Sequence, residues 1–144
     1  MRCAAASNID GESSFVCVVN DPAYSGLRKR PDLLPGKTET ITVRTERLDD
    51  HLPEGYAPSL IKIDVEGAQQ LVLEGAADNL SRFKPMVIFE HGAGAAASYG
   101  TRSSDVYGFL TAEAGLRIFD VERKWPVPVS LFESATYWNF VAHL

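Results

Sequence analysis

A short apolar segment that leads directly into two acidic residues restricts the fold of this chain more than any other feature. Residues 60–63 (Leu-Ile-Lys-Ile) are nearly all apolar and of strand length, which is typical of a strand covered on both faces in a parallel sheet. Asp64, Glu66 and Gly67 follow at once, and from Ala68 onward small or apolar residues recur at helical spacing. The sequence therefore predicts a buried strand, an acidic turn and then a helix.

The rest of the chain continues this alternation of strand and helix. Cationic residues followed by Pro85 indicate that the helix from Ala68 ends near Lys84. Further expected elements are strands at 13–19, 38–45, 86–89, 116–121 and 136–142, a helical turn at 48–52, a helix at 103–114, a polar loop at 20–37, and a small-residue lid at 92–100 without a helix of its own. This order predicts an α/β fold with a mostly parallel sheet and a C-terminal antiparallel strand pair, in one domain spanning residues 1–144.

Composition limits the possible functions. The chain has 144 residues and a net charge of −5, which argues against binding to a nucleic-acid backbone. No apolar run approaches the roughly 20 residues that a membrane helix needs, and the first residues do not resemble a signal peptide. We expect a cytoplasmic protein with no nucleic-acid or membrane partner.

Polar residues follow two neighbouring strands at the edge where an open α/β sheet binds its ligands. Asp64 and Glu66 follow the first buried strand, and Glu90 and His91 follow the next one. A right-handed crossover places both strand ends side by side. An imidazole or carboxylate there can accept a proton from a hydroxyl, and His91 is the natural candidate base. Asp64 is better suited to hold a cationic group.

Structural interpretations of these residues remain open. Asp64 or Glu66 can instead satisfy free backbone N–H groups at the start of the helix, and His91 can be an ordinary hydrogen-bonded loop residue. The two carboxylates with His91 could also bind a divalent cation, but their spacing is weak evidence, and no metal site is predicted.

Three segments of the chain resemble the FkbM family of methyltransferases. They are residues 60–68 (LIKIDVEGA), 73–76 (LEGA) and 84–91 (KPMVIFEH), with weaker agreement at 6–11, 25–27 and 42–50. The resemblance implies a class I, Rossmann-like methyltransferase fold, S-adenosylmethionine (SAM) as cofactor, and a small-molecule acceptor such as a metabolite or sugar hydroxyl. It also implies catalytic roles for His91, Glu66 and Glu90.

The resemblance further implies cofactor contacts by Asp64, Ala6 and Ser7. The glycine-rich turn and ribose-binding acid with which such enzymes hold SAM do not occur in the sequence. We therefore expect an incomplete form of the fold, the C-terminal portion of the catalytic domain. The strand at 60–63 would then have an unpaired edge, which favours self-association. The alternative function is a catalytically inactive binding module.

Overall fold

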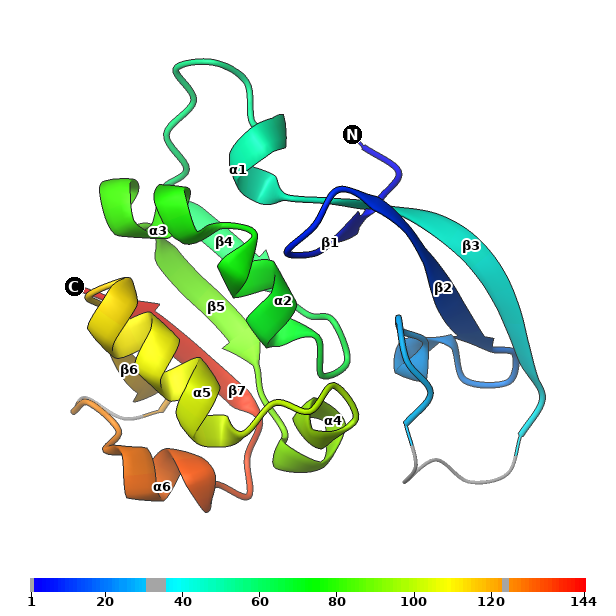
Figure 1. Cartoon of the computed structure of the whole chain (residues 1–144). Helices are drawn as coiled ribbons and strands as arrows, with labels where there is room; N and C mark the ends of the chain where they lie inside the picture. Colours follow the sequence, from blue (N-terminus) through cyan, green and yellow to red (C-terminus); the bar gives the residue numbers. More distant parts are fainter. Residues whose placement is uncertain (1, 31–35, 123–124) are drawn as a thin grey trace.

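Two β-sheets lie side by side in the computed structural model, which describes residues 2–30, 36–122 and 125–144 (Figure 1). The first sheet contains β1 (Ala5–Ala6), β3 (Thr38–Glu46) and β2 (Gly11–Val18), in that order. β2 and β3 pair antiparallel along their length, from Gly11 opposite Thr45 to Val18 opposite Thr38. The two early strands predicted from the sequence are therefore confirmed; the loop between them includes residues 31–35, which lie outside the described residues.

The second sheet has the order β4 (Leu60–Ile63), β5 (Met86–Glu90), β7 (Asn139–His143) and β6 (Arg117–Asp120). The predicted C-terminal antiparallel pair is confirmed as β6 and β7. The sheet is mixed rather than mostly parallel, because β7 runs antiparallel to both of its neighbours, β5 and β6. β4, β5 and β6 share one direction, but only β4 and β5 are a neighbouring parallel pair.

Short helices surround the second sheet, and α2, α3 and α5 lie in front of it in Figure 1. The described helices are α1 (Leu48–His51), α2 (Gln69–Glu74), α3 (Ala77–Phe83), α4 (Ala93–Ala97), α5 (Ser103–Gly108) and α6 (Val129–Glu133). A 3₁₀ turn occupies Pro22–Tyr24, and α5 continues into a π-helical turn at Phe109–Glu113. No helix among the described residues is long and apolar enough to cross a membrane.

Two helix predictions are corrected by the structure. The single helix expected from Ala68 to Lys84 is two helices, α2 and α3. The break lies at Gly75, where hydrogen bonds with Asp49 replace those of a continuous helix. The Asp49 backbone N–H donates to the Gly75 carbonyl (2.9 Å), and its carboxylate accepts the first free N–H groups of α3, those of Asp78 and Asn79. The loop at 92–100 does contain a helix, α4, in agreement with the high helix propensity of alanine.

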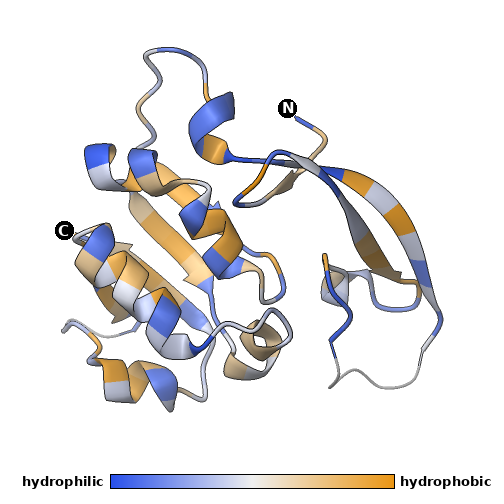
Figure 2. Cartoon of the chain, viewed as in Figure 1, coloured by the Kyte–Doolittle hydropathy of each residue, from blue (hydrophilic) through white to orange (hydrophobic). Residues whose placement is uncertain are grey.

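The hydrophobic core lies between the second sheet and its helices. Figure 2 shows strongly apolar colouring on β4 and β5. The most buried large side chains include Phe89, Phe140, Phe132 and Leu80. The expectation that β4 is covered on both faces is wrong: Ile63 is buried, but Leu60 remains 53% exposed. β4 is an edge strand in the described sheet, and part of it faces solvent.

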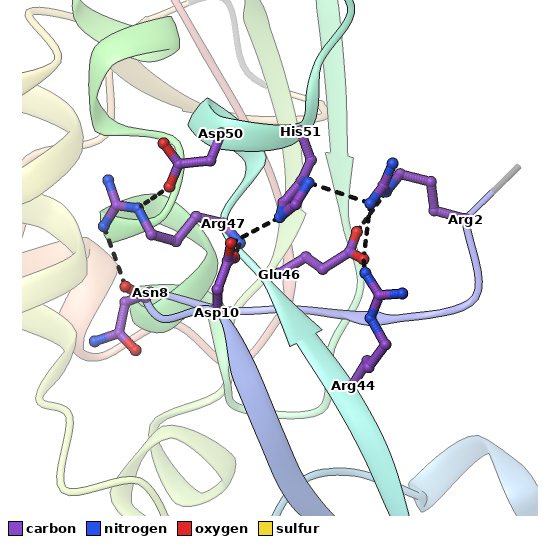
Figure 3. Close-up of polar contacts among 8 residues, drawn as sticks. All are labelled: Arg2, Asn8, Asp10, Arg44, Glu46, Arg47, Asp50 and His51. Carbon is purple, nitrogen blue, oxygen red and sulfur yellow. Dashed lines mark hydrogen bonds and ion pairs between the residues drawn. The ribbon is translucent and has the colours of Figure 1, made fainter.

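Ion pairs and hydrogen bonds join the first sheet to α1 (Figure 3). The Glu46 carboxylate at the end of β3 accepts hydrogen bonds from Arg2 and Arg44. His51 on α1 contacts Arg2 on one side and the Asp10 carboxylate on the other (2.8 Å). These contacts hold α1 against the first sheet.

Candidate active site

The pairing of β4 with β5 brings two acidic residues together at one edge of the second sheet. Ile63 pairs with Phe89 in parallel register, so the next residues along the two strands, Asp64 and Glu90, are neighbours. This edge is where the strands' carboxyl ends meet, the usual ligand-binding position in open α/β sheets. The convergence of Asp64 and Glu90 expected from the sequence is present.

A left-handed turn adds the third carboxylate. Glu66 has φ 48° and Gly67 φ 102°, so the chain reverses sharply between β4 and α2. A Cβ on Gly67 would overlap the backbone carbonyl of Ala95 in α4, so glycine is required by close packing as well as by its backbone angle. The turn therefore packs directly against α4, which follows β5.

The three carboxylates form a compact cluster. One oxygen from each of Asp64, Glu66 and Glu90 lies within 4.8 Å of the other two. Lys62 donates to Asp64 (2.7 Å) and Arg30 to Glu66 (2.7 Å), so two of the three acids have ion-pair partners. Burial raises the pKa of Glu90, and the negative charges of Asp64 and Glu66 raise it further, partly offset by Lys62. Glu90 is thereby made a better proton acceptor than an ordinary glutamate.

Two cavities meet at this cluster. The first, of about 450 Å³, is lined by Glu66, Glu90 and Gln69 together with residues of the 92–95 loop and Trp138. The second, of about 430 Å³, is lined by Asp64, Glu66 and Ala6 among others. Both volumes lie in the range of roughly 300–1,000 Å³ typical of small-ligand sites. Glu66 lines both cavities, so the two cavities lie next to each other at this residue.

His91 occupies the core rather than the described cavities. It is 3% exposed, its Nε2 contacts the Ser103 hydroxyl (2.8 Å), and its ring stacks on Phe132 at 4.8 Å between centroids. Burial lowers the pKa of His91 to about 4, so the imidazole is neutral at neutral pH. The structure thus separates His91 from the three carboxylates that the sequence grouped with it, and its role as a base remains a prediction.

Ala6 and Ser7 lie where the first sheet approaches the second. Ala6 lines the same cavity as Asp64, and its contact with a cofactor stays a prediction. Ser7 is 4% exposed, does not line the cavities described above, and presses its backbone carbonyl against Gly75. The environment of Ser7 is structural, whereas that of Ala6 is open to a ligand.

Several residues of the first cavity were not predicted from the sequence. Arg30, which lies in the polar loop expected at 20–37, pairs with Glu66, and its guanidinium lies over the Tyr24 ring at 5.3 Å. Gln69 and Trp138 line the cavity from α2 and from the segment before β7. Gln69 could have been found from the sequence, because it is a polar residue at the first position of a helix that follows an acidic turn. Nothing in the sequence indicates Arg30, Tyr24 or Trp138, because tertiary packing alone brings them to the cavity.

The acidic strand edge and the two cavities lie at the position where open α/β sheets usually bind their ligands. A family model described as "Methyltransferase FkbM domain" matches residues 2–117. This chain belongs to the FkbM methyltransferase family, as its sequence resemblance indicated.

Comparison with solved structures finds a methyltransferase FkbM from Methylobacillus flagellatus KT. The two are 18% identical with a TM-score of 0.46, over 71% of this chain and 24% of that chain. The chain therefore spans about a quarter of that protein's length. A comparison with curated proteins found no match.

Proposed function

We propose that this chain takes part in SAM-dependent O-methylation of a small metabolite or sugar hydroxyl, within a class I, Rossmann-like domain. The observation that carries the proposal is the cluster of Asp64, Glu66 and Glu90 at the junction of two cavities. Methyl transfer needs a donor and an acceptor held in line, and two adjoining cavities provide that arrangement. Family membership supports the reaction class.

The residues of the second cavity suit a cationic donor. SAM, when bound, supplies a methyl group on a positively charged sulfonium. Asp64 and Glu66 present negative charge to this cavity, and the small side chain of Ala6 leaves room for a ligand. Attraction between these carboxylates and a cation is strengthened where the site is partly shielded from water. We assign this cavity to the donor.

The residues of the first cavity suit a hydroxyl acceptor. Tyr24 and Trp138 offer aromatic faces, on which the apolar side of a sugar or similar ring can rest. The carboxylate of Glu90, with its raised pKa, takes the proton that the acceptor hydroxyl loses. Glu90 reaches the cavity, whereas His91 lies in the core, so the proposal places the base at Glu90.

NMR of the 144-residue chain, titrated with SAM and with S-adenosylhomocysteine, tests the donor assignment. The two ligands differ in the charge on sulfur. We expect amide shifts at residues 64–68 and weak binding, about millimolar, with tighter binding of the cationic ligand. Asp64→Asn should reduce the difference between the two ligands, whereas Asp78→Asn, a surface acid on α3, should not. Equal binding of both ligands to the unmodified chain would contradict the proposal.

Methyl transfer itself distinguishes the enzyme from a binding module. Tritiated SAM is incubated with the chain and a panel of sugars and hydroxylated metabolites. Transfer of label that is lost in Glu90→Gln supports catalysis with Glu90 as base. Donor binding without any transfer would instead favour the inactive binding module.

A further inference from the structure

We propose that Arg30 controls the access of a cationic ligand to Glu66. The ion pair between the two residues holds the segment 27–30 against the site, and a cation that binds Glu66 takes the place of the Arg30 guanidinium. Arg30 is thus a positioning residue, because it acts through Glu66. The identity of the incoming cation, the sulfonium of SAM, rests on the proposed function.

The segment that carries Arg30 forms part of the wall of both cavities. Tyr24 and Arg30 line the first cavity, whereas Gly26 and Leu27 line the second. Glu66 lines both cavities from the turn after β4. The ion pair between Arg30 and Glu66 is therefore made where the two cavities adjoin.

Backbone hydrogen bonds hold this segment to the first sheet before it reaches the site. Gly26 exchanges two of them with Val16 of β2, at 2.8 and 3.1 Å. Beyond Gly26, the Arg28 backbone N–H donates to the Tyr99 hydroxyl (3.1 Å), and the Arg28 guanidinium lies over the Tyr99 ring at 5.6 Å. Tyr99 follows α4. The segment therefore passes from the first sheet to the second before Arg30 meets Glu66.

The ion pair itself can be exchanged for another. Arg30 Nη1 donates to a Glu66 carboxylate oxygen at 2.7 Å, and the two side chains are 16% and 20% exposed. Removing the cation from such a pair leaves a partly buried charge without compensation, whereas replacing it by another cation does not. The guanidinium also lies over the Tyr24 ring, which is 37% exposed, so a displaced Arg30 keeps an aromatic contact near solvent.

The surrounding charges set up a competition. Asp64, Glu66 and Glu90 attract an incoming cation, and Lys62 already pairs with Asp64. Arg30 repels that cation as long as it occupies Glu66, because like charges at contact distance oppose each other. Removal of the Arg30 charge should therefore strengthen the binding of a cationic ligand. An ion pair that only stabilises the fold predicts no such gain.

Binding of SAM and S-adenosylhomocysteine to Arg30→Gln, measured by NMR titration, tests the competition. We expect the ratio of the two Kd values to shift about fivefold in favour of the cationic SAM, which corresponds to one competing ion pair near the surface. Lys29→Gln removes the same charge from the neighbouring exposed residue and should leave the ratio unchanged. Arg30→Lys keeps the charge and should return the ratio toward that of the unmodified chain.

A ratio that is unchanged or lower in Arg30→Gln overturns the competition. The donor assignment is judged separately, by whether the unmodified chain prefers SAM to S-adenosylhomocysteine. Absence of SAM binding by every variant would refute both the donor assignment and the displacement.

NMR relaxation of the backbone amides shows, without any ligand, whether the ion pair holds the segment. Arg30→Gln should increase the fast motion of residues 29 and 30, whereas Gly26, which is bonded to β2, should stay rigid. Addition of SAM to the unmodified chain should produce the same increase without a substitution. Equal order at residues 29 and 30 in Arg30→Gln and in the unmodified chain would overturn the proposal.

Discussion

His91 follows a β-strand and has the environment of a core residue. Its ring stacks on Phe132 and its Nε2 contacts the Ser103 hydroxyl, while Nδ1 is buried without a hydrogen-bond partner among the described residues. Packing and one hydrogen bond therefore hold an imidazole that burial keeps uncharged. Its side chain contributes to stability whether or not it contributes to catalysis.

Replacing His91 by Ala should lower the free energy of unfolding by about 2–4 kcal/mol, because the change removes a buried ring and leaves a cavity against Phe132. Urea denaturation followed by circular dichroism measures the loss. Ser103→Ala removes only the hydroxyl and should cost about 1 kcal/mol. An unchanged midpoint for His91→Ala would show that the ring is not packed as described.

The ion pairs of Figure 3 give the chain a dependence on acidic pH. The hydrogen bond from Arg2, with the charges of Arg2 and Arg44, lowers the pKa of Glu46 below its ordinary value of 4.5. A lowered pKa in the folded state means that the unfolded chain binds more protons. Stability from this group is present above about pH 4.5 and is lost as the pH falls through the folded pKa.

We therefore expect the free energy of unfolding to decrease between pH 5 and pH 3, and Glu46→Gln to reduce that decrease. Denaturation curves of both proteins at a series of pH values provide the measurement. Glu12→Gln, which replaces an exposed acid on β2, serves as the control. Parallel pH profiles for Glu46→Gln and the unmodified chain would rule out this role for Glu46.

The sequence could predict the parts of the site that depend on strand ends. Asp64 and Glu90 each terminate a strand, and neighbouring parallel strands must bring such residues together. Arg30 and Trp138 could not be predicted, because their positions depend on how the β2–β3 loop and the segment before β7 fold over that edge. His91 was grouped with the acids because it follows Glu90, yet alternation along the strand directs the imidazole into the core.

Among the elements, the division between α2 and α3 was not predictable from helical spacing, which continues through Gly75. The break depends on two distant segments: Asp49 caps α3, and the Ser7 carbonyl packs where a Gly75 side chain would be. The positions of β3 and β4 were predicted closely, but the burial of β3 does not alternate as expected, since Ile41 is 50% exposed. The sheet is mixed rather than mostly parallel because β7 lies between β5 and β6 and runs antiparallel to both. The period of apolar residues does not indicate this order of strands.

Gly75→Ala should destabilise the chain by more than about 2 kcal/mol, because the new methyl group would overlap the Ser7 backbone. Gly108 lies in α5, and a Cβ there would meet nothing within 4 Å. Gly108→Ala is therefore the matched control, and it should stabilise the chain by up to about 1 kcal/mol. Thermal denaturation of the two variants compares them directly; equal shifts in Tm would contradict the packing of Ser7 on Gly75.

At the scale of the whole molecule, β4 has β5 on one side and no paired strand on its other side in the described part of the chain. Leu60 and Met86 at one end of this pair are 53% and 43% exposed. An unpaired apolar edge can pair with the same strand of a second copy. The unpaired edge of β4 is therefore the surface at which we expect the self-association predicted from the sequence.

We expect concentration-dependent association of the chain, weakened by Leu60→Lys because a charge beside the edge opposes pairing. Sedimentation velocity over a range of protein concentrations detects it. Val121→Lys, at a residue 61% exposed just after β6, adds the same charge away from the edge and should leave association unchanged. A monomer at every concentration would exclude pairing through β4.

The contact between Ser7 and Gly75 also has a consequence for how the chain folds. It joins residues 68 positions apart and presses the first sheet against the break between two helices of the second. The contact between Ser7 and Gly75 cannot form until the chain between them has closed into a loop. Closing a long loop costs conformational entropy before the contact stabilises the structure, and this slows folding. The chain should therefore acquire its two sheets in a single cooperative step, with a rate set by this closure rather than by the formation of the local β2–β3 hairpin.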